Sequence, residues 1–131
     1  MEEYGIDGVF VQRFVNELQN CDPERPGSCG PRDFKDAVLT HALQNAEKRN
    51  RVVTLMYDIS GASEEKWVAT ILADWRHLIN DLKVLQSKAW LHHEDKPVLS
   101  VWGIGFTAHP GTPQVRKTPS WPRTWANFSL F

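Results

Sequence analysis

The hydrophobic positions of this chain follow two periods that alternate along the sequence. Short, mostly apolar runs typical of strands occur at residues 5–14, 51–58 and 97–103. Between these runs, apolar residues recur every three or four positions at 32–49 and 63–82, which predicts two amphipathic helices. The alternation of strands with helices predicts a parallel sheet built from right-handed strand–helix–strand units.

The segments around these elements carry weaker signals. Gly5 suits the left-handed residue that ends a helix, so a helix fragment is predicted over residues 1–4. Residues 16–31 are predicted to form a long polar loop, and residues 87–96 a polar connection before the third strand. Ser63 suits the N-cap of the second full helix.

The predicted fold class is α/β, with about three parallel strands, two full helices and an irregular C-terminal tail. Two helices cannot cover both faces of three parallel strands. We therefore interpret the chain as part of a larger α/β protein, either a doubly wound sheet or a (β/α)8 TIM barrel. A barrel takes about 250 residues, whereas this chain has 131. Residues 1–113 are assigned to a partial barrel domain, and residues 114–131, which lack any period, are predicted to lie outside the fold.

Composition excludes several function classes. The chain has 15 Lys+Arg and 16 Asp+Glu, a formal net charge of -1, so no whole-chain positive field for nucleic acid exists. No run of about 18 apolar residues is present, so no membrane span is predicted. The acidic start lacks the apolar core of a signal peptide. The compartment stays open, because a larger parent protein could be secreted.

The cysteines and histidines do not form a metal-ligand pattern. Cys21 and Cys29 flank a loop-like segment, and the sequence is equally compatible with a small disulfide loop and with two free thiols. Their spacing does not suit zinc. The adjacent His92 and His93 precede the third strand, on the side opposite the expected ligand site, and His77 is interpreted as a packed or solvent-edge histidine. No metal or other cofactor is predicted.

Candidate binding residues follow from the expected topology. In parallel α/β folds, ligands bind at the carboxyl ends of the strands. This rule selects five residues at the ends of the three strands: Gln12, Arg13, Tyr57, Asp58 and Trp102. Their amide, guanidinium, carboxylate and aromatic groups suit a polyhydroxylated ligand such as an oligosaccharide or polysaccharide. Structural alternatives remain for four of them: a surface ion pair for Arg13, and a turn or cap for Asp58. For Tyr57 and Trp102 the alternative is packing.

Other chemistries find less support. No Gly-rich phosphate loop follows any predicted strand, and the GxG at residues 103–105 is only a weak signal. The absence of this loop disfavours a nucleotide-binding domain. Glycoside hydrolysis uses two carboxyl groups about 5 to 9.5 Å apart. On the expected ligand side, Asp58 is one good candidate, and Glu17 in the predicted loop is a distant second. A complete pair is not visible, so no catalytic residue is assigned.

Four segments stand out when they are read in order along the chain: YGIDGVFVQRF (4–14), VVTLMYDISG (52–61), DWRHLIND (74–81) and WLHHEDKPVLSVWGIGF (90–106). Together they resemble glycoside hydrolase families 71 and 99, and more closely the related xylosidase/arabinosidase-type proteins. The resemblance covers roughly residues 1–113. It implies a (β/α)8 barrel that acts on polysaccharide or glycan chains. Family 99 members are retaining endo-α-mannosidases whose paired glutamates lie further along the chain, so no catalytic residue is carried over.

The resemblance implies that strands ending at Arg13, Asp58 and Trp102 line a sugar cleft. Our interpretation is a truncated glycoside hydrolase fragment that acts on glycosidic bonds as part of its parent and is inactive alone. The alternative is a non-catalytic carbohydrate-binding or interaction module that retains the aromatic half of the cleft. A three-stranded sheet also leaves open edges, which predicts low stability or self-association.

Overall fold

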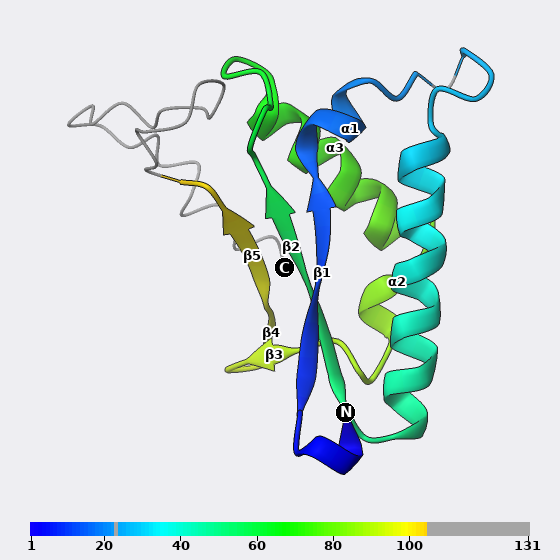
Figure 1. Cartoon of the computed structure of the whole chain (residues 1–131), viewed down its shortest axis with the longest axis vertical. Helices are drawn as coiled ribbons and strands as arrows, with labels where there is room; N and C mark the ends of the chain where they lie inside the picture. Colours follow the sequence, from blue (N-terminus) through cyan, green and yellow to red (C-terminus); the bar gives the residue numbers. More distant parts are fainter. Residues whose placement is uncertain (23, 105–131) are drawn as a thin grey trace.

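The computed structural model describes residues 1–22 and 24–104, which form a mixed α/β fold (Figure 1). Its centre is a three-stranded parallel sheet in the order β1-β2-β5. The strands are β1 (Gly8–Phe14), β2 (Val52–Asp58) and β5 (Leu99–Trp102), and the helices are α1 (Val15–Gln19), α2 (Gly30–Lys48) and α3 (Trp67–Asn80). The predicted parallel α/β class is confirmed. The predicted tail, 114–131, lies outside the described residues.

The sheet has one face packed against helices. Helices α2 and α3 lie on the same side of the strands (Figure 1). Side chains alternate between the two faces of a strand, and those of β2 that face the helices are almost fully buried: Val53 at 1% exposure, Leu55 at 0% and Tyr57 at 0%. On the other face, Phe10 of β1 is 57% exposed and Trp102 of β5 is 50% exposed. The core therefore lies between the sheet and the helices, and the opposite face, called here the open face, carries exposed aromatic rings.

The carboxyl ends of the three strands lie level with one another. Phe14 of β1 is paired with Asp58 of β2, and Asp58 is paired with Trp102 of β5. The backbone NH of Ile59 also donates to the carbonyl oxygen of Trp102 at 3.2 Å, so the contact continues just past the end of β2. This register brings the residues that end each strand to one edge of the sheet.

The N-terminal prediction is confirmed, whereas the loop predicted at 16–31 is wrong at its two ends, where α1 and the start of α2 lie. A 3₁₀ helix spans Glu2–Tyr4, and Gly5 ends it in the left-handed region with φ 65°. Within the expected loop, α1 begins directly after β1 and packs against α3. It buries Val15 (0% exposed) and Leu18 (8% exposed), three positions apart. One apolar pair is too short a pattern to distinguish a five-residue helix from a loop.

Two further local predictions need correction. The residue that caps α3 is Lys66 rather than Ser63, although the Ser63 carbonyl oxygen accepts a hydrogen bond from Trp67 N at 3.0 Å. The connection at 87–96 contains a small antiparallel hairpin of β3 (His92–His93) and β4 (Lys96–Pro97). This hairpin lies near the start of β5, away from the carboxyl ends of the strands (Figure 1).

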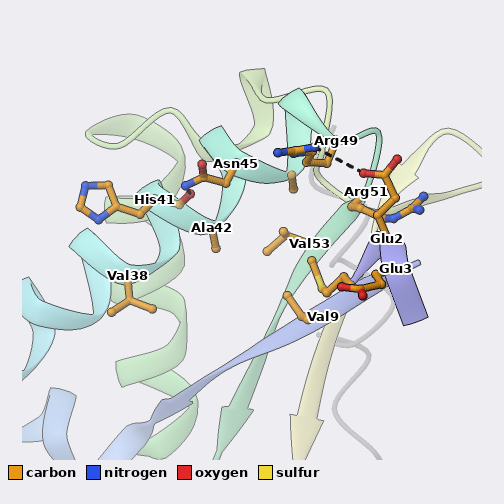
Figure 2. Close-up of a pocket in the computed structure, with 12 residues that line it drawn as sticks. Glu2, Glu3, Val9, Val38, His41, Ala42, Asn45, Arg49, Arg51 and Val53 are labelled. Atoms are coloured by element: carbon orange, nitrogen blue, oxygen red, sulfur yellow. Dashed lines mark hydrogen bonds and ion pairs between the residues drawn. The ribbon is translucent and has the colours of Figure 1, made fainter. Parts of the chain in front are cut away.

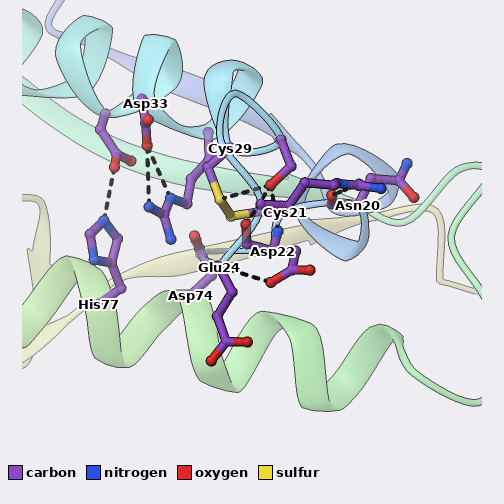
Figure 3. The surroundings of a disulfide bond; sticks show 12 residues. Asn20, Cys21, Asp22, Glu24, Cys29, Asp33, Asp74 and His77 are labelled. Carbon is purple, nitrogen blue, oxygen red and sulfur yellow. Dashed lines mark hydrogen bonds and ion pairs between the residues drawn. A yellow bond between two sulfur atoms is a disulfide. The ribbon is translucent and has the colours of Figure 1, made fainter.

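A disulfide joins Cys21 to Cys29, with an S–S distance of 2.05 Å. Of the two alternatives that the sequence left open, the structure has the bonded one. Cys29 is the N-cap residue of α2, so the bond ties the segment after α1 to the start of α2 (Figure 3). Ser28 Oγ stabilises the same loop through two hydrogen bonds to the backbone of Asp22. It accepts one from Asp22 N at 2.9 Å and donates one to the carbonyl oxygen of Asp22 at 2.5 Å.

Candidate functional site

The five candidate residues lie at the carboxyl edge of the sheet, but the structure divides them between its two faces. Arg13 and Tyr57 are register partners on β1 and β2, and both are buried on the helix-covered face. Their neighbours Gln12 and Asp58 point to the open face, because successive strand residues alternate. Trp102 is the register partner of Asp58 and belongs to the open face as well. The structure thus brings together three of the five on the surface where a ligand could bind.

On the open face, Asp58 orients Gln12. The Gln12 Nε2 atom donates a hydrogen bond to Asp58 Oδ2 at 2.7 Å, and Ser60 N donates to Asp58 Oδ1 at 2.9 Å. Asp58 is only 5% exposed, so its carboxylate acts mainly as an anchor. Its bond to Ser60 also confirms the turn interpretation made from the sequence. Gln12 is exposed and its amide oxygen faces no fixed donor in the described structure, which leaves it able to meet a ligand hydroxyl.

The other two candidates form a buried polar cluster beneath α3. Arg13 is 1% exposed and donates to both carboxylate oxygens of Asp74, from Nε at 2.7 Å and from Nη2 at 2.6 Å. The Tyr57 hydroxyl donates to Asp74 Oδ2 at 2.6 Å. The ion pair considered for Arg13 therefore exists, but it is buried rather than on the surface, and the packing interpretation of Tyr57 is confirmed.

The electrostatics of this cluster favour a charged Arg13 and a neutral Tyr57. Burial alone would lower the pKa of Arg13, but its hydrogen bonds and charge interaction with Asp74 raise it above its ordinary value. Burial raises the pKa of Tyr57 well above its ordinary value, and the negative charge of Asp74 raises it further. The phenol therefore stays protonated and serves as a hydrogen-bond donor to Asp74.

The cluster continues to Asp36 and His77, and from His77 to Asp81. The sequence reasoning missed both aspartates and considered His77 only as a packed or solvent-edge histidine. Arg13 Nη2 lies 2.7 Å from Asp36 Oδ1 of α2, an ion pair that is not aligned as a hydrogen bond. The other oxygen of Asp36 lies 2.8 Å from His77 Nε2, and His77 Nδ1 lies 2.7 Å from Asp81 Oδ2. The spacing of His77 and Asp81, four residues apart on a helix, was visible in the sequence as a pairing signal. The contact with Asp36, across 41 residues, was not.

A pocket also lies elsewhere on the helix side of the sheet, away from the carboxyl edge. It has a volume of about 900 Å³ and lies beside the amino halves of β1 and β2, under the second half of α2 (Figure 2). Its floor is apolar, with Val9, Ala42 and Val53, and an ion pair of 3.6 Å joins Arg49 to Glu2 at its rim. Ligands of parallel α/β folds bind at the opposite end of the strands. We therefore keep the carboxyl edge of the open face as the candidate site.

Three observations complete the description of the site. Among residues 1–22 and 24–104, no group of three or more metal-ligating side chains lies close enough to hold an ion. Across the same residues, no helix combines the length and the apolar character that crossing a membrane requires.

Comparisons with protein-family models, with curated proteins and with solved structures find no match for this chain. The glycoside hydrolase resemblance thus rests on the four sequence segments.

Proposed function

We propose that the open face of the sheet binds carbohydrate at the carboxyl ends of its strands. The observation that carries this proposal is the grouping of an anchored amide and an aromatic ring on one exposed surface. Asp58 holds the Gln12 side chain at 2.7 Å, and the half-exposed Trp102 lies on the neighbouring strand in register with Asp58. An amide can exchange hydrogen bonds with sugar hydroxyls, and an indole ring can cover the apolar face of a sugar.

We further propose that this surface is part of the cleft of a barrel-type glycoside hydrolase, as the sequence resemblance implies. The fold supports this, because the described sheet is parallel and the described helices pack on one side of it. In a barrel, the opposite side faces the interior and is filled by side chains of further strands. The exposed ring of Phe10, in the middle of β1, is consistent with such an interior position. Trp102 lies at the carboxyl end of β5, where the ligands of barrels bind.

The described residues supply binding groups rather than a catalytic pair. The three strands place one carboxylate on the open face, that of Asp58, and it is almost buried. Cleavage through two carboxyl groups would need a second acid from outside this surface. Glu17, the other residue considered from the sequence, lies in α1 rather than on a strand. The proposal for this chain is therefore carbohydrate binding, with hydrolysis assigned to a larger assembly.

The test is calorimetric titration of the 131-residue chain with manno-oligosaccharides and xylo-oligosaccharides. We expect saturable binding that Trp102→Ala or Gln12→Ala weakens roughly tenfold, a loss of about 1.4 kcal/mol in binding free energy. The matched control is Phe34→Ala, which removes an aromatic ring that is 66% exposed on α2, away from the site. Equal weakening by the control, or no binding to either sugar series, would refute the proposal. A reducing-sugar assay on the same sample tests turnover, and clear turnover would contradict binding without cleavage.

A further inference from the structure

We propose that His77 is a pH-sensitive latch between α3 and α2. As an imidazolium it bonds Asp36 and Asp81 at the same time, and it releases one of them when it loses its proton. The latch lies on the helix side of the sheet, so it is independent of the carbohydrate proposal for the open face.

The geometry of the ring favours its charged form. His77 Nε2 lies 2.8 Å from Asp36 Oδ2, and His77 Nδ1 lies 2.7 Å from Asp81 Oδ2. A neutral imidazole has a single N–H, so one of these contacts would then place a ring lone pair against a carboxylate oxygen. The imidazolium donates from both nitrogens, and it alone satisfies both contacts. Figure 3 shows His77 on α3 with its ring pointing toward α2.

The surroundings favour the protonated form. The side chain of His77 is 22% exposed and that of Asp36 is 12% exposed, so water and salt screen this pair less than a surface pair. The charged groups around the ring come from both helices, the segment after α3 and β1: Arg13, Arg32, Asp36, Asp74 and Asp81. Lys66, at the start of α3, lines the pocket beside the ring. Burial opposes protonation, and the positive charge of Arg32 opposes it as well. The bonds to Asp36 and Asp81 outweigh them, so the pKa of His77 is raised above its ordinary value of 6.5.

The latch is the outer end of a chain of charges that starts in the sheet. Asp36 lies between His77 and Arg13, which it meets at 2.7 Å, and Arg13 is fixed to Asp74. A pocket of about 470 Å³ lined by His77, Arg32 and Asp74 opens beside the ring, so protons can exchange with solvent. Loss of the proton leaves the ring one N–H, which can donate to only one of the two aspartates, while Asp36 stays paired with Arg13 of the sheet.

The sign of the effect on stability follows from the raised pKa. A histidine whose pKa is higher in the folded than in the unfolded state stabilises the fold most below the unfolded pKa, near 6.5. That contribution disappears as the pH rises through the folded-state pKa. Each unit by which the pKa of the folded state exceeds that of the unfolded state changes the unfolding equilibrium tenfold. The comparison is between a pH below both pKa values and a pH above both.

The experiment is urea unfolding at about pH 5.5 and about pH 8.5, with NMR titration of the imidazole signals. We expect wild type to lose stability toward the higher pH relative to His77→Gln, and the His77 ring to titrate above 6.5. The matched control is His41→Gln, because His41 is exposed on α2 and its removal should leave the pH dependence unchanged. If His77→Gln does not fold, Asp81→Asn provides the second variant, since Asp81 has a side chain 66% exposed and its loss should lower the pKa of His77. A His77 ring that titrates at or below 6.5, or equal pH dependence in wild type and His77→Gln, would overturn the latch.

Discussion

Replacement of Asp74 by alanine tests whether the buried cluster holds the strand ends to α3. Asp74 is 6% exposed, and its carboxylate accepts three hydrogen bonds, two from Arg13 and one from Tyr57. Its removal leaves the guanidinium of Arg13 buried with only the ion pair to Asp36. Breaking a buried ion pair on one side costs about 3–5 kcal/mol, because the remaining charge keeps its desolvation penalty.

That loss is large relative to a total stability of about 5–15 kcal/mol for a domain of this kind. The assay is equilibrium urea unfolding at neutral pH, in which a loss of 3 kcal/mol shifts the midpoint by about 1 M or more. The matched control is Asp33→Ala. Asp33 has a side chain 64% exposed and pairs with Arg32 at 3.2 Å, so we expect a loss below about 1 kcal/mol.

A second variant separates charge from shape. Asp74→Asn keeps the size of the side chain and one acceptor oxygen, so it should lose less stability than Asp74→Ala while still weakening the contact with Arg13. If Asp74→Ala is no more destabilising than Asp33→Ala, the cluster does not contribute to stability as reasoned here, and the strand ends must be held by apolar packing alone.

Two further predictions concern the loop and the sheet. Cys21→Ser, or reduction of the bond to Cys29, should lower the free energy of unfolding by about 2–3 kcal/mol, because the unfolded chain gains entropy when the loop is opened. Thermal unfolding with and without a dithiol reductant measures this loss, and an unchanged midpoint would contradict it. Gly8→Ala should lower the free energy of unfolding by about 1–3 kcal/mol, because the added Cβ would lie 2.5 Å from the carbonyl oxygen of Val52 on the neighbouring strand. The control is Gly30→Ala, where an added Cβ meets open space. Chemical unfolding compares the two variants, and equal losses of stability would refute the argument.

The architecture was readable from the sequence because each main element has a strong local period. The apolar run of β2 and the helical stripe of α3 gave their type and approximate bounds, and the alternation of strands with helices gave the parallel sheet. The register, which sets Phe14, Asp58 and Trp102 level, was not predicted, because the alternation gives the direction of the strands but not their pairing. The short α1 escaped prediction because its stability comes from packing against α3 rather than from its own pattern.

The position of the five candidate residues at the strand ends was predicted from the sequence, but the face of the sheet on which each one lies was not. Gln12 and Arg13 are adjacent in a strand, so they cannot both face a ligand. Arg13 lies two residues after Val11, on the core face of β1, and this alternation was a usable signal. What the sequence could not provide is the partner of Arg13, because Asp74 lies 61 residues away and pairs with it only after α3 packs on the sheet.

The two faces of the sheet explain why polar residues gather at the ends of these strands. On the helix side, a buried arginine needs a counter-ion, and Asp74 supplies one that also accepts the Tyr57 hydroxyl. This contact joins β1, β2 and α3 at the level of the residues that carry the open-face groups. Gln12 is adjacent to Arg13 in β1, so the hydrogen bonds of Arg13 with Asp74 on the helix side also restrict the movement of the backbone at Gln12. The polar residues on the helix side therefore have a structural role at the same strand ends, where they help to hold the neighbouring open-face residues in place.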